Sequence, residues 1–130
     1  MNLNFKISEL IQSDIAIQNN INNMPDINAL DNMLELIFHC LQPIRDLIKK
    51  PIIITSGFRC QKVNFFAGGA LNSQHLTGQA ADFVIKGMTP KEIIEIIKNS
   101  NIEYDQLIDE RTWVHISFNK GNNRKQILRK

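Results

Sequence analysis

The sequence predicts an α+β domain in which a small, largely antiparallel sheet packs against helices. Three observations lead to this fold class. One long segment carries apolar residues at steps of three and four, which is the spacing of an amphipathic helix. Several short apolar runs bounded by glycine, proline or polar clusters have the length of strands. The last two of these runs are separated by only a few residues, as in a β-hairpin.

The first part of the chain is expected to be helical. Residues 1–24 predict a short opening strand or turn and one or two short helices, with Ser8 as an N-cap. Pro25 marks a break. The apolar face that follows predicts a helix from about Asn28 to Lys49, and Pro43 inside it is expected to kink or split that helix.

Short strands and helices are expected to alternate after residue 50. PIIITSG predicts a short buried strand, and CQKVNFFAGG predicts a short helix that two glycines end. Residues 70–79 are polar and rich in turn formers, so we expect a loop. AADFVI then predicts a second strand.

The last third of the chain predicts one more helix and a strand pair. Thr89 is expected to cap this helix, with Pro90 at its first position and its end near Asn99. QLID and TWVHISF are expected to form the hairpin, and the basic tail GNNRKQILRK is expected to add an edge strand. The residues that this helix is expected to bury are Ile93, Ile94, Ile96 and Ile97.

Length and charge limit the function classes. The chain has 130 residues and a formal charge of +2, and 43% of its residues are hydrophobic. This size predicts one domain over 1–130, which divides into a helical N-terminal part (1–50), a central part (51–118) and a basic tail (119–130). A charge of +2 gives no broad footprint for nucleic acid, so nucleic acid is not an expected partner.

The sequence gives no sign of a membrane or secretory segment. It has neither a long apolar run nor a basic segment followed by an apolar one, so we expect no membrane insertion and no signal peptide. We expect synthesis in the cytoplasm and a monomer. Cys40 and Cys60 lie outside any CxxC motif, so both are expected to be reduced packing residues.

Two of the three histidines are candidates for chemistry. His39 lies within the long predicted helix and is expected to be a helix-surface or core histidine. His75 lies in the polar loop that leads into the second strand, where Asp82 stands between Ala81 and Phe83. A buried carboxylate at such a place needs a charged, hydrogen-bonded or metal partner.

Strand alternation places these groups on one face. Asp82 is expected to point away from the core on which Ala81 and Phe83 pack. In TWVHISF the same alternation turns Trp113, His115 and Ser117 away from the core, while Val114, Ile116 and Phe118 pack in it.

Two imidazoles and a carboxylate are a common catalytic zinc set, which leaves a fourth position for water. The spacing His75–Asp82–His115 alone leaves two alternatives open: a metal site, or a hydrogen-bonded polar cluster that lines a cleft.

The residues of four sequence motifs favour the metal site. TSGFRC, GGALNSQHLTGQAADF, YDQLIDE and TWVHISF resemble the D-alanyl-D-alanine metallopeptidase family, and most closely its short, phage-type members. The resemblance covers roughly residues 5–118, and the block from Ser73 to Asp82 is its most specific part. It implies a hedgehog/D-Ala-D-Ala-peptidase-like fold and one zinc ion held by His75, Asp82 and His115.

The resemblance also implies roles around the metal. Arg59 would hold a substrate carboxylate or the oxyanion that forms during attack. Ser73 and Gln74 would hydrogen-bond the substrate or shape the loop, and Trp113 is placed at the substrate. Many relatives carry an acidic general base three residues before the last histidine, where this chain has Thr112.

Two carboxylates remain as candidates for the base. The phage-type members have a glutamate at the position of Glu110, which is therefore favoured, and Asp109 is the alternative. The register of the hairpin decides which of the two points at the metal, because neighbouring strand residues face opposite ways.

These features predict a zinc peptidase, a D,D-carboxypeptidase or endopeptidase, that acts on peptidoglycan stem peptides. The implied setting is a phage or prophage protein that reaches the cell wall after release or as part of a virion. The first alternative is a non-catalytic, zinc-stabilised binding module, which Thr112 suggests. The second is nucleic-acid binding through the tail residues Arg124, Lys125, Arg129 and Lys130.

Overall fold

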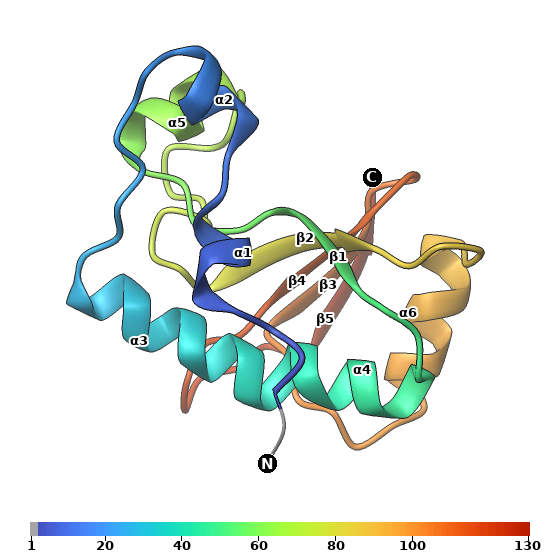
Figure 1. Cartoon of the computed structure of the whole chain (residues 1–130). Helices are drawn as coiled ribbons and strands as arrows, with labels where there is room; N and C mark the ends of the chain where they lie inside the picture. The colour runs from blue at the N-terminus through green and yellow to red at the C-terminus, as the bar shows by residue number, and fades with distance from the viewer. Residues whose placement is uncertain (1–2) are drawn as a thin grey trace.

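The computed structural model describes residues 3–130 as one five-stranded sheet with helices around it (Figure 1). Helices α3 and α4 form one long rod along the sheet, and α2 and α5 form a lobe that projects from the body (Figure 1). The helical elements are α1 (Ile7–Ile11), α2 (Asp14–Gln18), α3 (Ile27–Leu36), η1 (Ile37–Leu41), α4 (Gln42–Ile48), α5 (Gln61–Phe66) and α6 (Pro90–Lys98). The strands are β1 (Ile53–Ser56), β2 (Ala80–Val84), β3 (Gln106–Asp109), β4 (Val114–Ser117) and β5 (Gln126–Arg129).

The sheet has the strand order β1-β2-β4-β3-β5. Every neighbouring pair is antiparallel except β3 and β5, which run parallel. The predicted α+β class, the hairpin of QLID and VHIS, and the edge strand in the tail are therefore confirmed. The first two residues of the predicted opening segment lie outside the described residues.

The long helical rod supplies most of the core. The side chain of Asp26 caps α3 by accepting a 2.8 Å hydrogen bond from the N–H of Ala29. Pro43 lacks an N–H, and its ring would crowd the carbonyl four residues earlier. The rod widens into the π-helical turn η1 just before this proline instead of breaking. One face of the rod packs on the sheet, with the fully buried Met33, Leu36, Ile37, Leu41 and Ile44.

The core-facing side of the sheet follows the predicted alternation. Ala81, Phe83, Val114 and Ile116 are all buried in the same cluster as the rod. Because successive strand residues face opposite ways, Asp82 and His115 are turned to the other side of the sheet.

Three local predictions are wrong. Helix α1 begins one residue before Ser8, because Glu9 reaches back to accept a hydrogen bond from the N–H of Lys6. Strand β1 is not buried but lies at the sheet edge, and Ile53 is 52% exposed. Ile96 is 38% exposed, because it falls off the inward face of α6.

Other local predictions are confirmed. Thr89 and Glu92 form a capping box at the start of α6, and Asn99 ends this helix. Cys40 is buried and Cys60 half-buried, and both are free thiols. His39 lies on the helix surface, where it pairs with Glu35 at 3.0 Å and stacks on Phe118. Within residues 3–130, none of the helices has the length and apolarity that a membrane crossing requires.

Leu10 packs the short first helix against the rest of the core, and a substitution at this position tests the packing. Leu10 is 0% exposed, so Leu10→Ala should lower the free energy of unfolding by about 2–5 kcal/mol. Leu71 is 99% exposed and serves as the control, and Leu71→Ala should stay within about 0.5 kcal/mol. Urea unfolding measures both, and equal effects would contradict the assigned packing.

Candidate metal centre

The three predicted metal ligands meet on the face of the sheet opposite the core. Asp82 on β2 is paired across the ladder with His115 on β4. His75 comes from the loop that precedes β2. One ligand atom from each residue lies within 4.8 Å of the other two, and His75 and Asp82 are buried.

The distances within this group are short. His115 Nδ1 lies 2.9 Å from Asp82 Oδ1, and His75 Nε2 lies 3.3 Å from the same oxygen. The two imidazole rings stand edge to face, with their centroids 5.1 Å apart. Three donor atoms thus converge on one small volume.

The hydrogen bonds of His75 fix which ring nitrogen is free. His75 Nδ1 lies 2.7 Å from the carbonyl oxygen of Gly57. Because a carbonyl only accepts, Nδ1 carries a proton, which leaves Nε2, facing Asp82, as the ring nitrogen that would bind a metal ion. A backbone carbonyl that holds the far nitrogen of a histidine is a common support of a metal ligand.

Position 57 has room only for glycine. A Cβ atom on Gly57 would collide with the backbone of Leu10, including a 2.7 Å approach to its Cα. The carbonyl that orients His75 therefore depends on a close crossing between α1 and the end of β1.

Asp82 is ionised in spite of its burial. Burial raises the pKa of a carboxyl group, but the hydrogen bonds from His115 and His75 outweigh this effect. Together they hold the pKa of Asp82 well below its usual range.

Arg59 is fixed beside Asp82. Its Nε donates to Ser56 Oγ at 3.0 Å, and its Nη1 and Nη2 lie 3.4 Å from Asn64 Oδ1 and Asp82 Oδ2. Burial lowers the pKa of Arg59, while the charges of Asp82 and Glu110 raise it. The guanidinium is thus held in a fixed orientation beside the cluster of His75, Asp82 and His115.

A cavity of about 440 Å³ opens over these side chains. It has the size of a small-ligand site and is lined by polar and charged groups. Arg59, Glu110 and Trp113, all predicted from the sequence, line it together with the three metal ligands. Ser73 and Gln74 line it as well.

The hairpin register separates the two candidate bases. Ile108 pairs with His115 and also lines the cavity, so Glu110, two residues later, follows on the same side. Glu110 Oε1 is buried and accepts no hydrogen bond from residues 3–130. Asp109 instead accepts from the N–H of Arg111 at 2.8 Å and lies 3.8 Å from Arg129 Nε.

Ser73 and Gln74 hold the loop that carries His75. Ser73 Oγ accepts a 3.2 Å hydrogen bond from the N–H of His75. Gln74 Nε2 donates to Asp105 Oδ2 at 2.9 Å. Of the two roles left open by the sequence, the shaping of this loop is the one these contacts fulfil.

Asp105 is a site-supporting residue that the sequence reasoning missed. It is 0% exposed, and its carboxylate accepts from Gln74 and from Arg124 Nε and Nη2 at 3.0 and 2.8 Å. The N–H of Arg124 donates to it as well, at 2.7 Å. Asp105 therefore joins the His75 loop to the basic tail.

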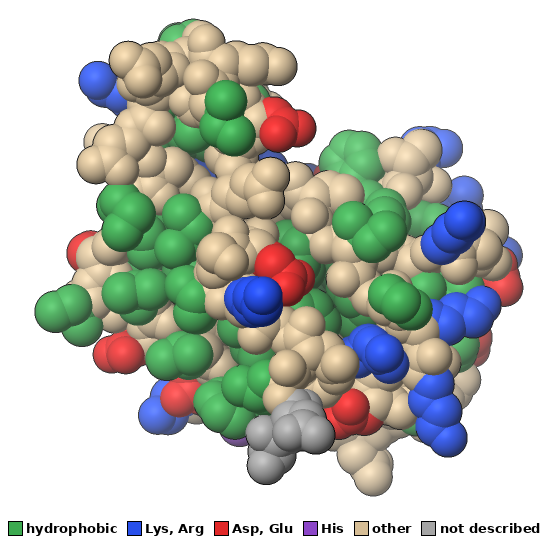
Figure 2. Space-filling model, in the orientation of Figure 1, with side chains coloured by type: hydrophobic (Ala, Val, Ile, Leu, Met, Phe, Trp, Pro, Cys, Tyr) green, Lys and Arg blue, Asp and Glu red, His purple; other side chains and the backbone are tan. Residues whose placement is uncertain are grey.

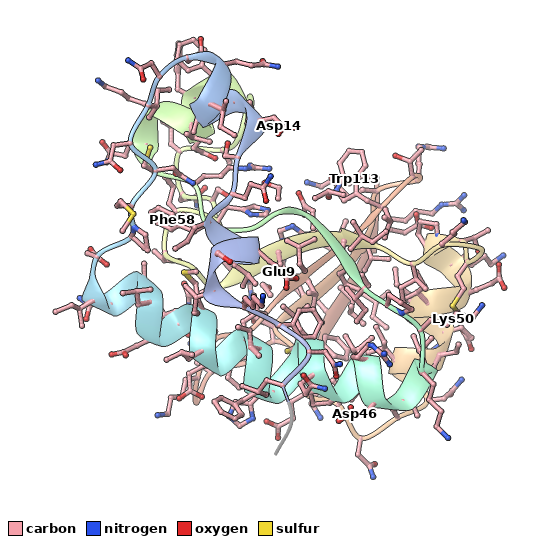
Figure 3. All side chains as sticks on the ribbon, in the orientation of Figure 1. Glu9, Asp14, Asp46, Lys50, Phe58 and Trp113 are labelled. Atoms are coloured by element: carbon pink, nitrogen blue, oxygen red, sulfur yellow. The ribbon has the colours of Figure 1, made fainter. Side chains whose placement is uncertain are left out.

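This tail is not a free basic patch. Arg124 pairs with Asp105, and Lys130 Nζ lies 3.9 Å from Glu110 Oε1. Arg124 and Lys130, which lie on either side of strand β5, both line the cavity. Figure 3 labels Trp113 near the ends of the strands, apart from the projecting lobe of α2 and α5.

The donor set fits zinc. Two imidazole nitrogens and one carboxylate oxygen leave room for a fourth ligand from the cavity, and zinc accepts this set in catalytic sites. His75 Nε2, which would give up its proton when a metal binds, and the ionised Asp82 supply the deprotonated ligands that metal binding requires.

Two histidines and an aspartate that converge over the open face of the sheet form a group that could hold a metal ion, as in catalytic zinc sites. A protein-family model described as Peptidase M15 matches residues 3–117. The chain therefore belongs to the M15 peptidase family, and the resemblance inferred from its motifs is confirmed. Members of this family are metallopeptidases. Comparison with curated proteins gave no match.

The Asp105 network gives a pH-dependent prediction. The hydrogen bond from the Arg124 side chain is the main cause that lowers the pKa of Asp105, to about 2. The ordinary value is about 3.9, so the stabilisation is complete above about pH 4 and is lost as the pH falls toward 2.

Asp105→Asn should therefore lower the free energy of unfolding by about 2 kcal/mol at pH 7, the range for hydrogen bonds to charged groups. The difference from the unmodified protein should shrink between about pH 4 and pH 2. Asp31→Asn, at an exposed position, is the control and should change little. A pH-independent difference in urea unfolding would refute the assignment.

Proposed function

We propose that the protein is a zinc-dependent peptidase that hydrolyses an amide bond next to a D-amino acid in peptidoglycan stem peptides. The observation that carries the proposal is the convergence of His75, Asp82 and His115 within 4.8 Å, in a cavity shared with Arg59 and Glu110. A zinc ion held there supplies Lewis acidity toward the peptide carbonyl and the attacking water.

Glu110 is the proposed general base. Its buried Oε1 has no hydrogen-bond donor among residues 3–130, so its lone pairs are free for the proton of a water molecule. The same carboxyl group then gives the proton to the amine that leaves. Asp109 is the weaker candidate, because it accepts a hydrogen bond from the N–H of Arg111 and does not line the metal cavity.

Arg59 is proposed to bind negative charge on the substrate. Its guanidinium is oriented by Ser56 and Asn64, so it needs little reordering when a carboxylate or a developing oxyanion arrives. Trp113 is proposed to contact the substrate from the cavity wall.

The setting of the activity is part of the proposal. We infer a single peptidase domain that works as a monomer on the cell wall, after release from the cell or as a virion component. The proposal rests on the motif resemblance to phage-type members of the family. A zinc-stabilised module that binds stem peptides without cleaving them is the second candidate, because the acid found in many relatives is replaced by Thr112.

Metal content tests the centre. The purified protein should carry about one zinc ion per chain. His75→Ala and His115→Ala should each weaken zinc binding by more than about a hundredfold, because a direct ligand is lost. His39→Ala is the control, since His39 lies on the long helix and should keep the zinc. A folded protein that never retains zinc would rule the centre out.

The base assignment is tested by two amide substitutions. Glu110→Gln should lower kcat on purified stem peptides by about 10²–10⁴-fold with zinc still bound, because the proton acceptor is lost. Asp109→Asn should retain most of the activity. Mass spectrometry of the products measures both and identifies the bond. Zinc binding without any hydrolysis would favour the binding module.

A further inference from the structure

We propose that the free edge of β1 binds the extended part of the peptide substrate as an additional strand. The proposal rests on the proposed function and specifies where the substrate lies beyond the bond that is cleaved. The peptide favoured by this site carries an amine on one of its side chains.

Strand β1 has the free edge that strand addition requires. It is the first strand in the order β1-β2-β4-β3-β5 and pairs with β2 alone. Among residues 3–130, the backbone of Ile53–Ser56 makes no hydrogen bond to a loop or helix. Unpaired N–H and C=O groups of an edge strand are the groups to which extended peptides add.

This edge is not open surface but one wall of a groove. A cavity of about 670 Å³ is lined on one side by Ile52–Ser56 and on the other by Gln12–Ile15, where α1 leads into α2. Val63 of α5 lies in the same lining. Figure 2 shows this face of the molecule hollowed between the projecting lobe and the body. The groove therefore runs alongside β1, with the segment that leads into α2 as its opposite wall.

The groove adjoins the metal cavity. Arg59 and Ala67 line both spaces. The last residue of β1, Ser56, pairs with Asp82 in the sheet and accepts a hydrogen bond from Arg59 Nε. A peptide that follows β1 therefore has one end at Arg59 and the metal ligands, where the bond to be cleaved would lie.

Charge in the groove favours an amine on the peptide. Glu9 and Asp14 line the groove. Among residues 3–130, Arg59, at the end nearest the metal site, is the one basic residue in its lining. Figure 3 shows both carboxylates projecting from α1 and α2 to the side on which β1 and Trp113 lie. An amine on a side chain of the peptide would lie near the carboxylates of Glu9 and Asp14. The carboxylate end of the peptide would lie near Arg59.

The test uses a stem pentapeptide with lysine at its third position as the probe. It is added to the zinc-loaded Glu110→Gln protein, and backbone amide signals are followed by NMR. We expect the amide signals of Ile53–Ser56 to shift, and exchange of their outward N–H groups to slow by about tenfold, because new hydrogen bonds form.

Two matched variants test the groove wall. Gln12→Trp fills the groove and should raise the Kd of the pentapeptide at least tenfold. Gln18→Trp, an exposed position on α2 outside the groove lining, should leave the Kd unchanged. Acetylation of the probe's lysine should raise the Kd about fivefold, and this increase should become smaller in Asp14→Asn, which keeps only Glu9.

The outcomes separate the groove from the proposed activity. Binding with shifts confined to the metal cavity, or no binding at all, would overturn the groove proposal. Hydrolysis by the unmodified protein is measured in parallel. Hydrolysis with unchanged β1 signals would contradict the groove alone, whereas β1 shifts without hydrolysis would support the groove and contradict the peptidase activity.

Discussion

A single buried carboxylate constrains the rest of this structure. Asp82 stands in the second strand of the sheet, and its ionised form must be stabilised inside the protein by groups that carry protons or positive charge. His75, His115 and Arg59 supply them, each from a different element. The loop that carries His75, the hairpin that carries His115 and the segment after β1 that carries Arg59 must therefore keep fixed positions around the two carboxylate oxygens of Asp82.

Contacts on both sides of the sheet hold the groups around Asp82 in place. On the core side, the long helical rod packs against β2 and β4 and fixes the ladder that sets Asp82 opposite His115. On the open side, two hydrogen-bonded supports hold the His75 loop. One is the Gly57 carbonyl, and the other is the Asp105 carboxylate acting through Gln74. The segment that leads into β5 then forms part of the cavity wall through Arg124.

Local patterns predicted the elements, because alternation along a strand decides which side chains share a face. Asp82 and His115 could be placed together in this way. The motif resemblance was needed to favour a metal site over a polar cluster and to include His75, which lies in a loop. Sheet order is not a local property, so the apolar run of β1 was wrongly expected to be buried. Asp105 was missed because its partners, Arg124 and Gln74, lie 19 and 31 residues away. The choice of Glu110 over Asp109 needed the register of the hairpin.

The central claim is that one metal ion joins the His75 loop, β2 and β4. The most direct measurement is a crystal structure of the zinc-loaded protein with diffraction data collected on both sides of the zinc absorption edge. The account predicts one anomalous peak within bonding distance of His75 Nε2, an Asp82 oxygen and a ring nitrogen of His115. A peak at other side chains, or no peak between these three residues in zinc-saturated crystals, would contradict it.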